Sequence, residues 1–240
     1  MRHGVDAVHP VFVRTGIIQP EDSEGVLSGV WGAIDQRISW PVHESAVGGD
    51  GEGDTSMKAF LGDPAIKQQY LARLRAHAQA DELIHGTYWE HGKGCAVGCT
   101  VHSSNHTAYE TELGIPEVLA RLEDGLFESL PNGDAKEFPI QFLDAIPVGA
   151  DLSRVWPSFA VWLLLDKEDG VIRFSTGFPQ VQETIQGIGN LFKKVLNGQP
   201  VTEAARAAGA ARAAAGAAGA ARFEHYACGL LDLIVGKDPT

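Results

Sequence analysis

The residues best suited to chemistry lie close together, in the segment from His85 to Glu112. This Cys/His segment contains two of the three cysteines and four of the nine histidines of the chain: Cys95, Cys99, His85, His91, His102 and His106. Thiolates and imidazoles act as nucleophiles, as general bases and as metal ligands. The Cys/His segment is therefore the candidate functional site.

The first hypothesis is a metal site formed by four residues of the segment, Cys95, Cys99, His102 and His106. Their C-x3-C-x2-H-x3-H spacing resembles that of zinc ligands, so zinc or iron is the expected cofactor. The same intervals are typical of one helix face, on which the outer two residues lie roughly 16 Å apart. A four-ligand site therefore requires a break in the helix, for which Ser103-Ser104-Asn105 is suited. Without that break, an adjacent pair would need a further ligand such as His85 or His91.

The second hypothesis is a cysteine-dependent enzyme. Gly92-Lys93-Gly94 would place Cys95 at a helix N-terminus, where the helix dipole and Lys93 lower the pKa of a thiol. Cys95 or Cys99 would be the nucleophile, and His85, His91 or His102 the catalytic base, with His102 the first choice. A disulfide between the two cysteines is disfavoured on a helix, because Cβ atoms four residues apart are too distant for the bond.

The third hypothesis is a binding site, in which His85, Trp89, Lys93 and Gly94 contact a ligand and the Gly-Lys-Gly backbone forms a nest for an anion. A P-loop is excluded, because five residues separate Gly86 from Gly92 and Gly94 stands where Ser or Thr is required. In the competing interpretation, the segment has a structural role and neither reacts nor binds a ligand. In it, the CAVGC sequence is a helix of small residues packed in the core, where buried cysteines are inert.

The elements that must position this segment are mainly helices. Asp63 followed by Pro64 predicts a helix N-terminus, and the apolar spacing that follows predicts a helix to about His85. After the segment, Thr107 and Glu110 match a capping box for a short helical turn.

The helix after Pro116 has one apolar stripe, formed by Val118, Leu119, Leu122, Leu126, Phe127 and Leu130. The charged residues of the helix are expected to lie largely off this stripe: Glu117, Arg121, Glu123, Asp124 and Glu128.

Further elements follow towards the C-terminus. Residues Asp134–Ile146 are predicted to form a helix interrupted near Pro139, and Asp151–Asp166 another helix. Val171–Phe174 is predicted to be a short strand. A last core helix begins at Pro179, and Gly198 is its natural stop.

Three regions are distinguished by composition. Residues 1–56 carry nine acidic and three basic residues and end in a Gly-rich linker, so they are interpreted as a partly disordered N-terminal extension. Residues 57–200 are predicted to form the helical core domain. Residues 201–240 are predicted to form a long Ala-rich helix that packs on the core. The expected fold is therefore all-α, an irregular multi-helix bundle.

Charge and hydropathy exclude some classes of function. The net charge of −12 argues against nucleic-acid binding, which depends on an excess of Lys and Arg. No apolar run approaches the roughly 18 residues of a membrane span, and the N-terminus lacks the pattern of a secretory signal. A cytoplasmic location is expected.

The stretch YWEHGKGCAVGCTVHSSNHTAYETELGIP, Tyr88 to Pro116, and the stretch AIPVGADLS, Ala145 to Ser153, carry a resemblance. With them the chain resembles a group of uncharacterised bacterial and phage-associated proteins, which have a GKGCAVGC-type motif and often an Ala-rich C-terminal tract. The resemblance covers roughly Met57 to Arg222. No activity is assigned to that group, so the resemblance implies kinship and no mechanism.

These observations lead to an ordered set of expectations. The first is a helical binding or accessory protein whose Cys/His segment forms a site for a small molecule or a protein partner. The alternatives are a cysteine-dependent enzyme and a metal-binding protein. A homo-oligomer formed through the C-terminal helix is also expected.

Overall fold

The computed structural model of the chain describes residues 57–199 and 223–239. In this part of the chain 65% of residues are helical and 3% are in strands, which confirms the all-α prediction. The helices are α2 (Pro64–Gln79), α3 (Ala96–Val101), α4 (Ala108–Leu113), α5 (Glu117–Ser129), α6 (Asn132–Ala145), α7 (Val155–Leu165), α8 (Pro179–Leu196) and α10 (Phe223–Ile234). Two 3-10 turns, η2 (Ala59–Gly62) and η3 (Val171–Ser175), and a hairpin of β1 (Trp89–Glu90) and β2 (Lys93–Gly94) complete the set.

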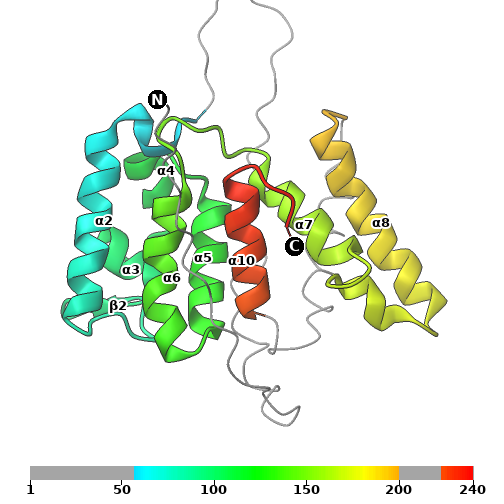
Figure 1. The fold of residues 1–240 in the computed structure, drawn as a ribbon, viewed down its shortest axis with the longest axis horizontal. Coiled ribbons are helices and arrows are strands. Elements are labelled where there is room, and N and C mark those ends of the chain that lie inside the picture. Colours follow the sequence, from blue (N-terminus) through cyan, green and yellow to red (C-terminus); the bar gives the residue numbers. More distant parts are fainter. Residues whose placement is uncertain (1–56, 200–222, 240) are drawn as a thin grey trace, which may run out of the picture.

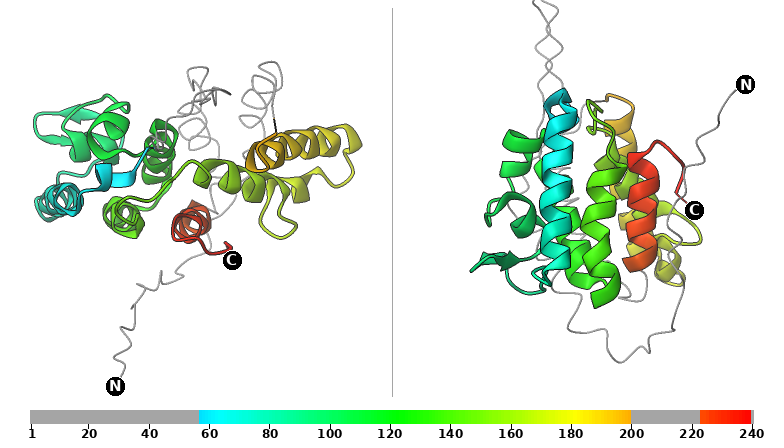
Figure 2. Two further views of the ribbon diagram at one scale, coloured as in Figure 1. Left: turned by 90° about the horizontal axis from the view of Figure 1, so that it is seen from above. Right: turned by 60° about the vertical axis from the view of Figure 1, so that its left-hand side comes forward.

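The helices form a bundle with α5 at its centre. Helices α2, α6 and α10 stand side by side in Figure 1, and α5 packs against α3, α4, α6 and α10. Helix α7 packs against α10, η3 and α8. Figure 2 shows that the α7–α8 pair extends away from the side of the bundle that carries α2. The Cys/His segment and the α7–α8 pair therefore occupy opposite ends of the molecule.

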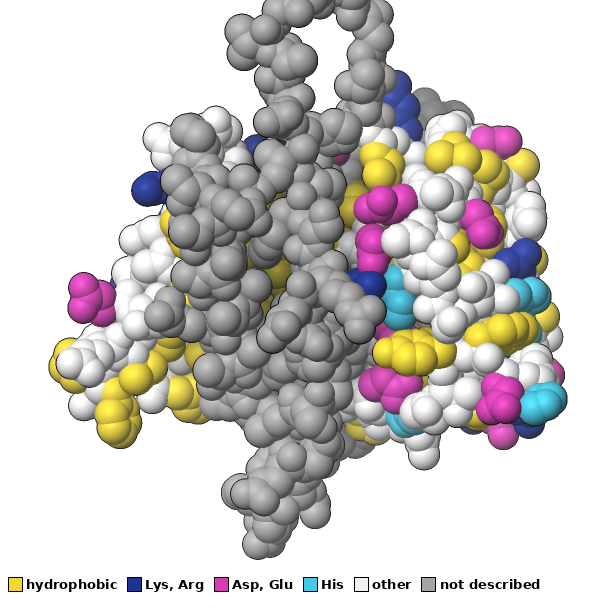
Figure 3. Space-filling model, turned by 180° about the vertical axis from the view of Figure 1, so that it is seen from behind, with side chains coloured by type: hydrophobic (Ala, Val, Ile, Leu, Met, Phe, Trp, Pro, Cys, Tyr) yellow, Lys and Arg dark blue, Asp and Glu magenta, His cyan; other side chains and the backbone are white. Residues whose placement is uncertain are grey.

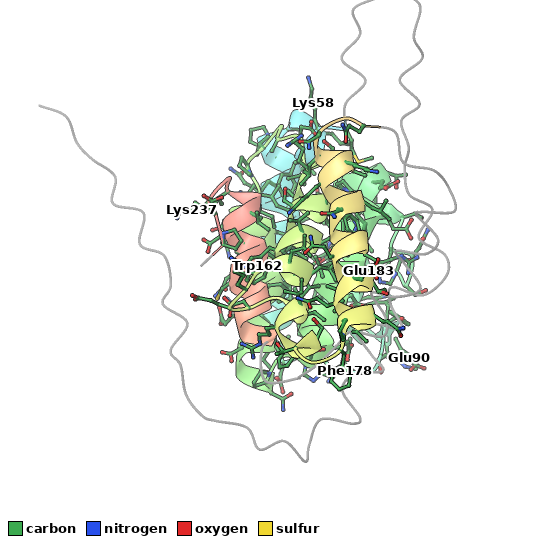
Figure 4. The ribbon with its side chains drawn as sticks, turned by 90° about the vertical axis from the view of Figure 1, so that its right-hand side faces the viewer. Lys58, Glu90, Trp162, Phe178, Glu183 and Lys237 are labelled. Atoms are coloured by element: carbon green, nitrogen blue, oxygen red, sulfur yellow. The ribbon has the colours of Figure 1, made fainter. Side chains whose placement is uncertain are left out.

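The C-terminal helix α10 is docked on this bundle. Leu230 and Ile234 on α10 are buried in the hydrophobic core. Gly229 lies against the ring of Trp162 on α7, where an added Cβ would come within 2.5 Å of the ring, so a residue without a side chain is needed. Figure 4 shows Trp162 beside α10. Phe223–Ile234 therefore packs on the core, whereas the predicted helix over 201–240 as a whole stays a prediction.

Helix α2 begins as predicted and ends earlier. Asp63 is its N-cap and accepts a hydrogen bond from the backbone N–H of Ala65, with Pro64 in the first turn. The helix ends at Gln79 rather than near His85, because Leu83 instead forms a β-bridge with Gly94. A tertiary contact therefore overrides the helical spacing of the apolar residues.

Helix α5 departs from the predicted surface pattern. Glu123 is fully buried and Asp124 is 4% exposed, so the expectation that both lie off the buried face is wrong. The physical reason is the central position of α5, which has neighbours on several sides. The capping box is also wrong, because the Glu110 carboxylate accepts from the N–H of Glu117 and the Thr107 side chain makes no cap bond.

Other local predictions had mixed outcomes. Helix α6 is continuous from Asn132 to Ala145 with Pro139 inside it, so the predicted interruption is absent. Val171–Ser175 is a 3-10 turn and not a strand. Helix α8 runs from Pro179 to Leu196, and Gly198 has the positive φ of 66° expected of a stop.

Two of the predicted segments lie outside the described residues: the extension 1–56 and the Ala-rich tract up to residue 222. The division into three regions stays a prediction. Among the helices in the described ranges, none is both long enough and apolar enough to cross a membrane.

Candidate functional site

The Cys/His segment is folded by a tight hairpin whose backbone lies close to the next helix. His91 and Gly92 connect β1 to β2 with φ values of 50° and 82°, and type I′ turns require positive φ at both central positions. The backbone oxygen of Tyr88 then lies against Gly94 and Gly98, where added Cβ atoms would be 2.1 and 1.6 Å from it. Gly94 and Gly98 of the GKGCAVG sequence are therefore packing residues, whereas Gly92 is a turn residue.

Cys95 is the N-cap of α3, as the sequence predicted, but its thiol is not activated. Its Sγ accepts from the N–H of Gly98 at 3.5 Å, and the residue is 1% exposed. Burial raises the pKa of the thiol, and the charge of Asp124 raises it further. The prediction of a lowered pKa is wrong, because desolvation outweighs the effect of the helix N-terminus and Lys93 is exposed to solvent.

Cys99 is buried as well. Its Sγ lies 3.4 Å from the backbone oxygen of Gly94 and 3.6 Å from that of Glu82. Burial raises the pKa of this thiol to about 12. Cys95, Cys99 and Cys228 are not in disulfides, in agreement with the argument from helical spacing. Both thiols of the segment match the packed-core interpretation.

The predicted anion nest is also not formed. The N–H of Gly94 donates to the backbone oxygen of Glu82 at 3.1 Å, and the N–H of Cys95 donates to that of Thr87 at 2.7 Å. These donors are therefore used within the fold. The exposed side chain of Lys93 remains on the outside of the hairpin.

The four residues of the predicted zinc site are separated. Helix α3 ends at Val101, and its C-cap His102 has a left-handed φ of 53°, one residue before the predicted break. His102 then turns to α2, whereas Nε2 of His106 lies 3.4 Å from Asp124 and the two thiols bond to backbone atoms. In residues 57–199 and 223–239, no group of three or more His, Cys, Asp or Glu side chains is placed to hold a metal ion.

The structure instead pairs His102 with a histidine of α2. Nε2 of His102 lies 2.8 Å from Nε2 of His77, which is in the last turn of α2. The chain then turns so that Glu82 donates its N–H to the backbone oxygen of His77. Its carboxylate lies 2.7 Å from Nδ1 of the same histidine. A carboxylate, an imidazole and a second imidazole thus form one hydrogen-bonded row.

An aromatic ring supports this row from the hairpin. Trp89 stacks on His102, with ring centroids 4.6 Å apart and planes 11° apart, and contacts the edge of His77 at 5.6 Å. His77 is largely buried, at 12% side-chain exposure, whereas His102 is exposed. We call His77, Glu82, Trp89 and His102 the histidine cluster. Figure 3 shows histidines, acids and hydrophobic side chains together on the half of the molecule that carries it.

Arg73 is a cation beside the histidine cluster. It lies one turn before His77 on α2 and donates to the backbone oxygen of Thr100 at 2.6 Å, which holds α3 against α2. Burial lowers the pKa of His102, and the charges of Arg73 and His77 lower it further. The neutral imidazole is therefore favoured at this position.

A second cluster of polar side chains is buried beneath the hairpin. Tyr109 donates to Glu123 at 2.7 Å, and Asp124 lies 3.4 Å from His106 and beside Cys95. One oxygen of each acid, Oε1 of Glu123 and Oδ1 of Asp124, has no hydrogen-bond partner. Burial raises the pKa of Glu123 well above its usual value, and the charge of Asp124 adds to the effect. The protonated form of this carboxyl group is therefore favoured.

The remaining predicted binding residues are dispersed. His85 is exposed beside a pocket of about 240 Å³ that Asn132 and Lys136 of α6 also line. Burial of part of its ring against Phe127 lowers its pKa. His91 is at the exposed tip of the hairpin and pairs with Glu90. Of the predicted ligand-contacting residues, Trp89 is the one that belongs to the histidine cluster.

Sequence reasoning missed His77 and Glu82 in the cluster, and Asp124 beneath the hairpin. His77 is a single histidine in the last turn of a helix, with Glu82 five residues later, and this pattern is too common to be informative. The available indication was the helical spacing of Tyr70, Arg73 and His77, which puts three hydrogen-bonding side chains on one face of α2.

Comparison of the chain with protein-family models, with curated proteins and with solved structures gives no match.

Proposed function

We propose that this chain is a helical binding protein whose ligand site is the histidine cluster. The observation that supports it is the 2.8 Å approach of His77 Nε2 to His102 Nε2, with Glu82 on the far side of His77. When a ligand replaces the hydrogen bond between them, these two imidazoles can each offer their Nε2 to it. Trp89 supplies an apolar ring beside them. This combination of a few polar groups with an aromatic wall is typical of small-ligand sites.

A cysteine-dependent enzyme is the second candidate, and one observation favours it. Asp124 contacts both Cys95 and His106, so a thiol, an imidazole and a carboxylate come together beneath Tyr88. Two properties of Cys95 weigh against it. The thiol is 1% exposed, and its raised pKa opposes the thiolate that acts as the nucleophile. The histidine cluster therefore ranks first.

A thermal-shift panel tests this proposal. The panel contains phosphate, citrate, a nucleoside triphosphate, free amino acids, and the chlorides of magnesium, zinc and nickel. A ligand that binds the folded chain raises its melting temperature. The proposal expects at least one compound to stabilise the wild type and to have little effect on His102→Asn.

The matched control is His91→Asn. His91 and His102 have φ values of 50° and 53°, and Asn tolerates that conformation well, so both variants carry the same change in the same backbone geometry. Equal stabilisation of all three proteins, or stabilisation of none, would contradict the proposal.

A further inference from the structure

We infer that the ligand of the histidine cluster is a divalent transition-metal ion of the zinc, nickel and copper class. This inference rests on the proposed function and narrows it to one class of ligand. Nε2 of His77 and Nε2 of His102 would be the two protein ligands. Imidazole nitrogen is a preferred ligand of all three ions.

The tautomer of His77 is already suited to metal binding. Its Nδ1 lies 2.7 Å from a carboxylate oxygen of Glu82, and since a carboxylate accepts, Nδ1 carries the proton. The lone pair of His77 is therefore on Nε2, which faces His102. With His77 neutral, His102 donates its Nε2 proton to this lone pair in the metal-free protein. Metal binding at Nε2 requires His102 to carry its proton on Nδ1 instead, and the exchange can take place through solvent, which His102 contacts directly.

The distance between the two nitrogens fits one ion after a small shift. Zinc–nitrogen bonds of about 2.0–2.1 Å at a tetrahedral ion place two nitrogens roughly 3.3 Å apart. The nitrogens are now 2.8 Å apart, so they must separate by about half an ångström. His102 is exposed and lies parallel to Trp89, so a shift within the plane of its ring keeps the stack.

Glu82 provides the outer support that metal-binding histidines usually have. Such histidines almost always donate their second N–H to a carboxylate, a backbone carbonyl or water, which fixes the ring and raises its basicity. Glu82 is 31% exposed and so stays partly shielded from solvent behind His77.

The charges around the two histidines limit the affinity for a metal ion, and the ligand type determines which ions bind. The negative charge of Glu82 favours a cation, whereas Arg73 on the same side of α2 opposes it. Two protein ligands leave at least two positions for water or a bound molecule, so micromolar affinity is expected. Magnesium and calcium prefer oxygen ligands and are not expected to bind.

Isothermal titration calorimetry of the chelator-treated full chain, without a polyhistidine tag, tests this inference. Zinc chloride is expected to bind the wild type and His91→Asn with about one ion per chain. We expect binding at least tenfold weaker in His102→Asn and in His77→Gln. Magnesium chloride should give no heat of binding.

A loss of zinc binding in these variants could also result from misfolding, and Glu82→Gln is the control for this. It keeps both imidazole nitrogens and removes only the carboxylate. Zinc binding should weaken about 10- to 100-fold in it, as is usual for loss of an outer carboxylate. Unchanged zinc binding in all variants, or none to the wild type, would overturn the inference. If another compound of the panel stabilises the wild type and not His102→Asn while zinc does not bind, the binding site stands and the metal assignment fails.

Discussion

The indole of Trp89 and the imidazole of His102 lie nearly parallel, with planes 11° apart and centroids 4.6 Å apart. Trp89 comes from the hairpin, whereas His102 ends α3. This contact joins two parts of the Cys/His segment that are far apart in its sequence. It also defines the direction in which His102 faces α2.

Removal of the indole should therefore weaken the link between the hairpin and α3. We expect Trp89→Leu to lower the free energy of unfolding by about 0.5–1.5 kcal/mol more than Trp89→Phe, which keeps an aromatic ring. Urea denaturation followed by far-ultraviolet circular dichroism measures both. Equal losses in the two variants would show that the stack contributes nothing.

The contact between Gly98 and the Tyr88 carbonyl predicts strong destabilisation by a single methyl group. An added Cβ would lie 1.6 Å from that backbone oxygen, so Gly98→Ala must displace the hairpin from α3. We expect a loss of about 3 kcal/mol or more, at the upper end for overpacking.

Gly187→Ala is the control, because nothing lies within 4 Å of the added atom and the position is inside α8. It should stabilise the chain by about 0.5–1 kcal/mol. Thermal melting of both variants checks the pair. A mild effect of Gly98→Ala would mean that the hairpin does not lie against α3 in solution.

The buried acid Glu123 predicts a dependence of stability on pH. Its folded pKa is raised well above the ordinary 4.5, mainly by burial. The stability that it contributes is therefore present below its unfolded pKa and is lost as the pH rises through the folded value.

We expect Glu123→Gln to gain stability relative to the wild type as the pH rises from about 5, by up to about 1.4 kcal/mol per pH unit. The amide oxygen can still accept from Tyr109. Glu183→Gln on the exposed face of α8 is the matched control (Figure 4). If the free energies of unfolding of Glu123→Gln and the wild type changed in parallel with pH, the raised pKa of Glu123 would be contradicted.

The burial of the thiols predicts the order in which they react. In a cysteine-dependent enzyme Cys95 or Cys99 would react first, whereas the structure predicts that they react last. Cys95 and Cys99 are buried with raised pKa values, whereas Cys228 on α10 is partly exposed. With a disulfide reagent at pH 8, Cys228 should react first and Cys228→Ser should remove the fast phase. If Cys95→Ser removed it instead, the cysteine-dependent enzyme would become the leading candidate.

Local rules predicted the ends of some elements correctly. Asp63 with Pro64 fixed the start of α2, and Pro179 with Gly198 bounded α8, because capping and backbone restrictions act within a few residues. The end of α2 depended on a bridge between Leu83 and Gly94, which no local pattern encodes.

Only part of the candidate site could be predicted from the sequence, because two of its four residues lie outside the Cys/His segment. The Cys/His segment contributes His102 and Trp89, and both were selected from the sequence. Their partners His77 and Glu82 come from the end of α2 and the turn after it, and they meet the segment only because α3 packs on α2. The cysteines attracted attention by type, but their burial was decided by the tertiary fold.

The central claim is that His77 and His102 act as one site, and imidazole nitrogen NMR tests it most directly. Long-range proton–nitrogen spectra would be recorded during a zinc titration, with His77→Gln and His102→Asn used for assignment. The account predicts that the Nε2 signals of His77 and His102 move together and are complete at one equivalent, while those of His91 and His106 stay in place. Movement of His91 or His106, or of His102 without His77, would contradict it.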